Sequence, residues 1–84
     1  MKLLYFSWIR ERVGMGEESL DLPADVATIA DLIAWQKSRG EGFEAAFEHE
    51  TAVRVALDQE HCDDRQTPLA GVSEIAFFPP MTGG

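Results

Sequence analysis

The stretch Glu74-Ile75-Ala76-Phe77-Phe78-Pro79-Pro80 lies close to the C-terminus of this 84-residue chain. Its first five residues are rich in β-branched and aromatic side chains, which predicts a strand over residues 74–78. Proline cannot donate to a strand ladder, so the proline pair ends that strand abruptly. We therefore expect a single folded domain over residues 1–78, followed by an extended, flexible tail over residues 79–84.

The elements before this strand are predicted from hydrophobic spacing and capping signals. Leu3 to Ile9 is too short for a buried helix and rich in aromatic residues, so we expect a strand buried on both faces. Thr28 followed by Asp31 resembles a capping box, and it heads a helix that should stop at Gly40. The other expected elements are short: a turn of helix over 10–13, a strand over 18–22, a helix containing Phe43, Ala46 and Phe47, a strand over 51–57 and a strand over 60–63.

This order of elements favours an α+β domain with the β-grasp topology. We expect a mixed sheet of four to five strands, covered by one main helix and a short second helix. In this topology the first and last strands lie side by side in the middle of the sheet. The loops between elements fall at the Pro, Gly and Asp-rich positions, as turn chemistry predicts.

The pleat of the two central strands predicts a helix-free apolar face. If Tyr5, Ile75 and Phe77 face the helix, alternation sends a second set of residues to the other side, where they would form a docking surface. Phe6 and Phe78 are the expected anchors of that surface. The alternative is that a strand is placed one residue out of phase or that the short helix covers the patch. The predicted set is Leu4, Phe6, Trp8, Ala76 and Phe78.

Composition and charge restrict the classes of partner and the compartment that we expect for this chain. Fifteen acidic residues against seven basic ones give a net charge of −8, which disfavours nucleic acid and favours a basic protein surface. The single cysteine, Cys62, cannot form an internal disulfide, so we expect a reducing, cytoplasmic compartment. The apolar run over 3–9 is followed at once by charged residues and has no cleavage site, so we expect neither a signal peptide nor a membrane helix.

The last four residues, Met81-Thr82-Gly83-Gly84, suggest a chain end that enters another protein. An extended exit from Pro79 would reach roughly 20 Å beyond the domain. Glycines carry no side chain that would block a narrow channel, so the carboxylate of Gly84 becomes the one functional group presented. We therefore expect that carboxylate to be the reactive group, with Gly83 giving access to the channel.

The sequence resembles the MoaD-type ubiquitin-like sulfur carriers, the small subunits of molybdopterin synthase. The resemblance spans nearly the whole chain and is most specific where Phe77-Phe78-Pro79-Pro80 is joined to the terminal Gly-Gly. Three departures concern the contact with the partner: Asp58 stands where Asn is usual, residues 70–73 replace an Asp-Gly-Asp turn, and His61 replaces an apolar residue. The other matching segments are residues 4–6, 10–11, 13–14, 27–32, 58–60, 67–69, 74–76 and 81–82.

The resemblance implies a cycle in which the chain carries sulfur. An ATP-using enzyme related to ubiquitin-activating enzymes adenylates Gly84, and a sulfur donor protein converts it to a thiocarboxylate. The tail then enters the large synthase subunit, where the sulfur reaches cyclic pyranopterin monophosphate and builds the molybdopterin dithiolene. The resemblance therefore implies that the chain is no enzyme by itself and binds no cofactor stably. The catalytic residues of the synthase would belong to the large subunit, within a heterotetramer of two large and two small subunits. The expected partner contacts are Phe6, Arg10, Phe78, Pro79, Pro80, Met81 and Thr82.

Other functions stay open beside this one. A sulfur carrier for thiazole or amino-acid synthesis shares the terminal Gly-Gly, and so does a ubiquitin-like modifier that is joined to lysines; a plain binding module with an incidental tail is a further alternative. Neither His61-Cys62-Asp63-Asp64 nor Glu48-His49-Glu50 has metal-ligand spacing, so we expect no metal site. Cys62 is expected to be a half-buried small hydrophobe rather than a sulfur store.

Overall fold

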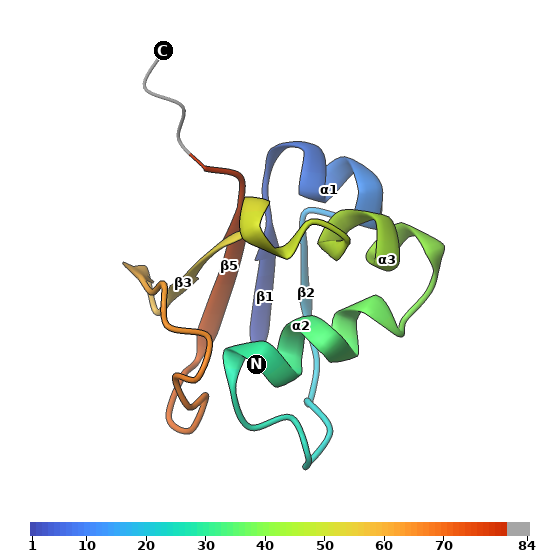
Figure 1. The fold of residues 1–84 in the computed structure, drawn as a ribbon. Helices are drawn as coiled ribbons and strands as arrows, with labels where there is room; N and C mark the ends of the chain where they lie inside the picture. The colour runs from blue at the N-terminus through green and yellow to red at the C-terminus, as the bar shows by residue number, and fades with distance from the viewer. Residues whose placement is uncertain (81–84) are drawn as a thin grey trace.

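The computed structural model describes residues 1–80, and its sheet has the strand order β2-β1-β5-β3-β4. The helices lie together on one side of this sheet, as Figure 1 shows. This arrangement confirms the predicted α+β, β-grasp fold with a mixed five-stranded sheet. The elements are β1 (Lys2–Tyr5), α1 (Ser7–Val13), β2 (Glu17–Ser19), α2 (Ile29–Lys37), α3 (Glu41–Phe47), the 3₁₀ helix η1 (Glu50–Ala52), β3 (Arg54–Leu57), β4 (Glu60–His61) and β5 (Glu74–Phe78).

The first and last strands form the centre of the sheet, as predicted. β1 and β5 run parallel, with Leu3 opposite Ile75 and Tyr5 opposite Phe77. The other neighbouring strands pair antiparallel. A parallel pair needs a long crossover, and the chain between β1 and β5 supplies it by passing through all the helices on one face.

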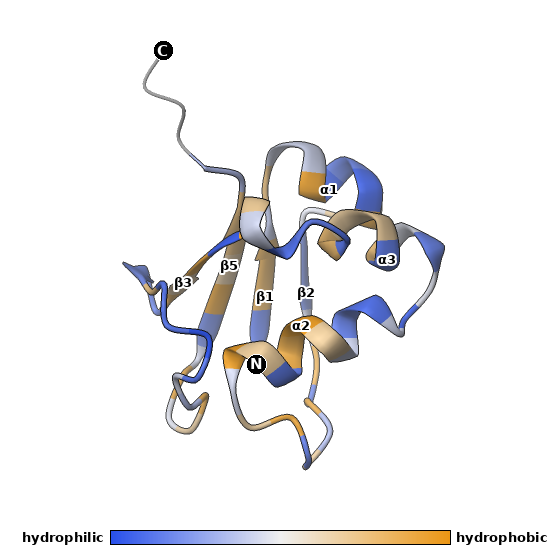
Figure 2. Cartoon of the chain, in the orientation of Figure 1, coloured by the Kyte–Doolittle hydropathy of each residue, from blue (hydrophilic) through white to orange (hydrophobic). Residues whose placement is uncertain are grey.

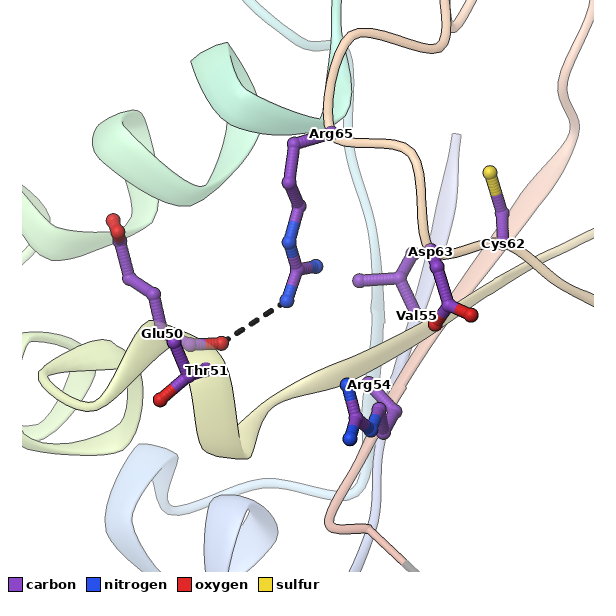
Figure 3. Close-up of a pocket in the computed structure, with 7 residues that line it drawn as sticks. All are labelled: Glu50, Thr51, Arg54, Val55, Cys62, Asp63 and Arg65. Atoms are coloured by element: carbon purple, nitrogen blue, oxygen red, sulfur yellow. Dashed lines mark hydrogen bonds between the residues drawn. The ribbon is translucent and has the colours of Figure 1, made fainter.

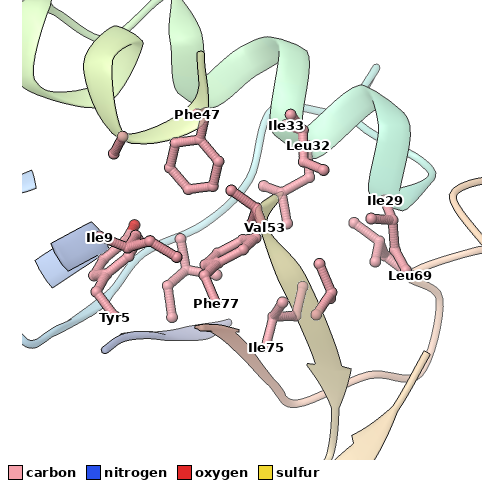
Figure 4. Packing of buried hydrophobic residues seen from close by; sticks show 13 residues of the cluster. Tyr5, Ile9, Ile29, Leu32, Ile33, Phe47, Val53, Leu69, Ile75 and Phe77 are labelled. Carbon is pink, nitrogen blue, oxygen red and sulfur yellow. The ribbon is translucent and has the colours of Figure 1, made fainter. Parts of the chain in front are cut away.

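The core lies between this sheet and the helices (Figure 4). Tyr5, Ile75 and Phe77 face the helices and are almost fully buried, so the predicted phase of these strands is confirmed. The Phe77 ring stacks on the Tyr5 ring, with centroids 5.7 Å apart. The Phe77 and Phe47 rings form a T-shaped pair, with centroids 5.0 Å apart. In Figure 2 the hydrophobic colour marks the start of α2 and much of the central strands.

The first strand is shorter than predicted. It ends at Tyr5 rather than Ile9, because Ser7 takes a φ of 52° and starts helix α1. Helix α1 buries Ile9, and Gly14 ends it in the left-handed region with φ 91°, donating its N–H to the Arg10 carbonyl at 2.8 Å. The predicted turn of helix over 10–13 is therefore the second half of a seven-residue helix.

Helix α2 begins as its capping signal predicts. The Asp31 N–H donates to Thr28 Oγ1 at 3.2 Å, and the Asp31 carboxylate accepts from the Thr28 N–H at 3.1 Å. The two bonds give acceptors to the backbone N–H groups of Thr28 and Asp31, which have no partner within the helix. The helix ends at Lys37, three residues before the predicted stop at Gly40.

The remaining strands are present but shorter than predicted. β2 ends at Ser19 instead of continuing to residue 22, and β4 covers only Glu60–His61. β3 starts at Arg54, because η1 occupies the residues just before it. The predicted Asp58-Gln59 turn is confirmed, and both residues have positive φ, the pattern of tight hairpin turns. Within residues 1–80, no helix has the length and apolarity needed to cross a bilayer.

Candidate functional site

The helix-free face of the sheet carries a row of half-buried apolar side chains next to the end of β5. Leu4 of β1 and Ala56 of β3 both pair with Ala76, so these three residues lie side by side across the sheet. Phe78 follows on the same face at the end of β5. The structure thus brings together Leu4, Ala76 and Phe78, as predicted, and adds Ala56.

Trp8 does not belong to this face, contrary to the prediction. It lies in helix α1, where it packs partly buried against the core. The Arg12 guanidinium lies over its ring, 4.7 Å from the centroid, as residues four apart on a helix can. Alternation along a strand placed Trp8 on the sheet face, and that inference fails because the strand has already ended at Tyr5.

Phe6 and Arg10 lie on a second part of this surface, at the end of β1. Phe6 precedes helix α1 and donates its N–H to the Phe77 carbonyl at 3.1 Å, which ties it to β5. Its side chain is 46% exposed, although it is large and apolar. Phe6, Leu4 and Arg10 line one shallow hollow at the end of β1. Two predicted contact residues, one apolar and one basic, therefore line the same hollow.

His61 flanks Phe78 and was not among the predicted contact residues. The two rings meet edge to face, with centroids 5.8 Å apart, and His61 Nε2 lies 2.9 Å from Asp63 Oδ1. The strand β4 brings His61 there, since it pairs with Ala56 of β3, the strand next to β5. The sequence signal for this position was the Asp58-Gln59 hairpin turn, which fixes the register of β4.

The predicted tail begins where this face ends. Pro79 and Pro80 follow Phe78 and are half-buried. The predicted residues Met81, Thr82, Gly83 and Gly84 lie outside the described residues, so their roles stay predictions. The position of Phe78, Pro79 and Pro80 means that a partner holding the tail would also lie close to the helix-free face.

A buried polar cluster lies on the opposite, helix-covered side of the sheet. Tyr5 Oη donates to Glu18 Oε2 at 2.6 Å and accepts from Gln36 Nε2 at 2.8 Å, while Arg39 donates to Glu18. Burial, and then the hydrogen bond to Glu18, raise the pKa of Tyr5 above its usual range. Hydrogen bonding from Arg39, and then from Tyr5, lowers the pKa of Glu18 against the opposing effect of burial. The cluster joins β1, β2 and α2, so it stabilises the domain away from the apolar face.

Cys62 and the two segments with metal-ligand residue types lie within the described part of the chain. Residues 1–80 contain no group of three His, Cys, Asp or Glu side chains placed to hold a metal ion. Cys62 is a half-buried free thiol whose sulfur lies 3.2 Å from Thr67 Oγ1.

Comparisons with known proteins give matches over nearly the whole chain. The family model described as the ThiS family matches residues 3–84. The molybdopterin synthase sulfur carrier subunit of Caenorhabditis elegans is 31% identical over 85 residues, which cover 100% of this chain and 96% of that protein. The protein of the same name from Escherichia coli (strain K12) is 31% identical over 84 residues, covering 100% and 99%.

Solved structures share the fold over almost the full length. A putative molybdopterin converting factor, subunit 1, from Pyrococcus furiosus superimposes with a TM-score of 0.75 at 26% identity, covering 95% of each chain. SAMP1 from Haloferax volcanii superimposes with a TM-score of 0.66 at 25% identity, covering 100% of this chain and 98% of that one. Because the family model and two relatives above 30% identity extend over nearly every residue, the chain belongs to the ThiS family.

Proposed function

We propose that this chain is the sulfur carrier subunit of a molybdopterin synthase. The observation that carries this proposal is the end of β5. Phe78, on the helix-free face, leads directly into Pro79-Pro80, and the ThiS family model matches the chain onward through Gly83-Gly84. The names of the relatives from Caenorhabditis elegans and Escherichia coli support the same function.

The proposed chemistry takes place at the C-terminal carboxylate of Gly84. A free carboxylate is a poor electrophile, so a ubiquitin-activating-like enzyme joins it to AMP from ATP and releases pyrophosphate. Sulfur delivered at the sulfide level by a donor protein then forms a bond to the acyl carbon, the C–O bond to AMP breaks, and AMP leaves with its electron pair, so that a thiocarboxylate remains. The chain needs no bound cofactor of its own for this cycle, because ATP is consumed by the activating enzyme. ATP and free thiols are available together in the cytoplasm, which is the proposed location.

The large synthase subunit is the proposed acceptor of the loaded tail. Its active site would supply the acid and base groups for sulfur transfer to cyclic pyranopterin monophosphate, and this chain would supply the nucleophilic sulfur. Gly83 lets the chain end pass through a narrow channel, since it has no side chain. Met81 and Thr82 would lie inside the partner, and Pro79 and Pro80 at its entrance.

The helix-free face is the proposed docking surface for that subunit. Phe6 and Phe78 are large apolar residues at two points of this face, and residues of this type dominate binding energy in interfaces. Arg10, which lines the same hollow as Phe6, would contact a partner carboxylate. The net charge of −8 would speed encounter with a basic partner surface.

Two alternatives share the activated terminus and differ in the acceptor. A carrier for thiazole or amino-acid synthesis would deliver its sulfur to another synthase, and a ubiquitin-like modifier would be joined to lysines. The acceptor is therefore tested separately from the activation.

The first experiment measures the intact mass of the full chain after incubation with ATP, a cognate activating enzyme and a sulfur source. We expect a gain equal to the replacement of one oxygen by sulfur, and no gain when Gly84 is deleted. The loaded chain should then convert cyclic pyranopterin monophosphate to molybdopterin when the large subunit is added. No gain, with an activating enzyme that loads another carrier, would contradict the carrier function. Lysine-linked adducts in cells would favour the modifier instead.

A further inference from the structure

A small pocket lies at the free edge of the sheet, next to the strand that leads into the tail. It is enclosed by η1, the first half of β3 and the loop after β4, and its volume is about 220 Å³ (Figure 3). β4 pairs only with Ala56 and Leu57, so it leaves the edge of β3 uncovered at Arg54. Arg54 pairs with Phe78 on the other side, which places the pocket beside the end of β5.

Arg65 reaches from its loop into this edge of the sheet and fills only part of its hydrogen-bonding capacity. Its Nη2 donates to the Val53 carbonyl at 2.6 Å. The same nitrogen donates to the Glu50 carbonyl at 3.0 Å, the bond drawn in Figure 3. Its Nη1 is buried and has no acceptor among the described residues. A buried donor without an acceptor costs about 1–3 kcal/mol, so an added acceptor at this position would stabilise the protein.

The two arginines of the pocket also lack acidic partners within residues 1–80. The ion pairs of the described chain are Lys2–Glu17, Lys37–Glu50, Arg39–Glu18 and His61–Asp63, and none includes Arg54 or Arg65. The two carboxylates that line the pocket, those of Glu50 and Asp63, are directed to Lys37 and His61. In a chain with fifteen acidic residues, this pocket holds two guanidinium groups that have no carboxylate within ion-pair distance among the described residues.

We propose that Arg54 and Arg65 form a binding site for a carboxylate side chain of the protein that receives the tail. A carboxylate is planar and accepts two parallel N–H bonds from a guanidinium, so it matches the unfilled Nη1 of Arg65 and the free Arg54. The pocket is smaller than the sites that hold drug-sized ligands, which suits one side chain rather than a nucleotide. Nη1 is shielded from solvent, so the ligand reaches it only after a small shift of the lining side chains.

The location and the overall charge favour a carboxylate that a partner brings over a free anion. The site adjoins Phe78, so a protein that holds the tail would cover it; this step rests on the proposed function. The net charge of −8 weakens the binding of a free anion without abolishing it, whereas a docked partner presents its carboxylate at high effective concentration. An Asp or Glu of the large synthase subunit is therefore the assigned ligand.

The test compares Arg54→Gln with Arg12→Gln in the full chain. Arg54 makes no side-chain hydrogen bond or ion pair among the described residues, so its loss should leave the fold intact. Arg12 lies in helix α1, does not line the pocket, and makes one exposed hydrogen bond, to the Ala45 carbonyl, so the thermal midpoint of both variants is measured first. We expect Arg54→Gln to weaken binding to the large subunit encoded by the same genome by about tenfold at low salt, since charged hydrogen bonds have about this strength. Arg12→Gln should change binding less than twofold, as an exposed charge does. An equal loss in both variants, or none in either, would overturn the proposal.

A second measurement tests whether Arg54 and Arg65 bind a carboxylate, even if the large subunit is not the partner. Sodium acetate and inorganic phosphate are titrated into the wild-type chain, and the guanidinium N–H resonances of arginine are followed by NMR. Saturable acetate shifts confined to Arg54 and Arg65, absent in Arg54→Gln and kept in Arg12→Gln, would support the carboxylate site. No saturable shift would overturn it, and phosphate binding more than about tenfold tighter than acetate would overturn the assignment to a carboxylate. Failure of the wild type to bind the large subunit, with the acetate shifts present, would contradict the proposed function alone.

Discussion

Arg39 holds Glu18 through two parallel hydrogen bonds, Nη1 to Oε2 at 2.7 Å and Nη2 to Oε1 at 2.8 Å. The pair joins the segment after helix α2 to the edge strand β2, and both side chains are largely shielded from solvent. The Arg39 guanidinium also lies over the rings of Trp35 and Phe43, 4.7 and 4.1 Å from their centroids. One arginine therefore fixes the main helix, the short helix α3 and β2 to one another.

Replacing Glu18 with Gln should destabilise the domain by about 1–3 kcal/mol at pH 7, because Arg39 would lose its charged acceptor. The lowered pKa of Glu18 gives this effect a pH dependence. A carboxyl whose pKa is depressed in the folded state stabilises above its unfolded pKa, about 4.3, and the contribution disappears as the pH falls through the folded value. The difference between variant and wild type should therefore shrink in acid. Urea unfolding at pH 7 and at about pH 3 measures both quantities.

The control for this prediction is Glu17→Gln. Glu17 pairs with Lys2 at 3.6 Å, but its side chain is 65% exposed, so its removal should cost under about 0.5 kcal/mol. Equal destabilisation by Glu17→Gln and Glu18→Gln would mean that net charge, rather than the Arg39 pair, sets the stability.

Tyr5, the one tyrosine of the sequence, should resist ionisation while the protein is folded. Burial and the hydrogen bond to Glu18 raise its pKa above the usual value near 10, since both favour the neutral phenol. A raised folded pKa gives stability that is complete below about pH 10 and is lost as the pH rises further. Phenolate absorbance should therefore appear together with unfolding rather than before it. A titration of the folded chain near the ordinary value would contradict the observed cluster.

Gly42 permits close contact between helices α1 and α3. A Cβ built on it would lie 2.4 Å from the Arg12 carbonyl oxygen, and backbone cannot yield as a flexible side chain does. Gly42→Ala should thus destabilise the domain by about 1–3 kcal/mol, as overpacking does. At an open helical position the same change would stabilise by about 1 kcal/mol, so the sign of the change in thermal unfolding distinguishes the two cases.

The features predicted correctly from the sequence are those with local physical causes. The Thr28–Asp31 box lies within one helical turn, and the alternation of Ile75 and Phe77 lies within one strand. Helix α1 was partly missed because a seven-residue helix with one fully buried residue, Ile9, gives almost no periodic signal. The aromatic residues Tyr5, Phe6 and Trp8 extended the predicted strand into the helix. The sequence signal for the helix was its end, because glycine at Gly14 is typical of a left-handed C-cap.

The features missed altogether depend on long-range contacts. Tyr5, Glu18 and the pair Gln36 and Arg39 come from three separate places in the chain, and each polar residue alone is typical of a solvated surface. The pocket beside β3 likewise depends on a loop that returns Arg65 to the Val53 carbonyl, a contact across 12 residues. Neither set has a spacing pattern that a single sequence displays.

Phe78 should be required for docking but not for folding. Its side chain lies on the helix-free face, half-buried, while the neighbouring Phe77 fills the core. Phe78→Arg would place a charge at the centre of the proposed interface, and we expect affinity for the large subunit to fall at least about thirtyfold, the loss typical of an anchor residue. The thermal midpoint should move by only a few degrees, since the core is untouched.

The matched control is Ala34→Arg, which adds the same charge on an exposed position of helix α2, on the other side of the sheet. Binding measured by calorimetry should be unchanged in this variant. Full binding by Phe78→Arg would refute the helix-free face as the docking surface, whereas equal loss in both variants would point to charge rather than to contact. Mass analysis of thiocarboxylate formation separates the two partners: if Phe78→Arg is loaded normally but transfers no sulfur, the face serves the acceptor, and if loading also fails, the activating enzyme uses the same surface.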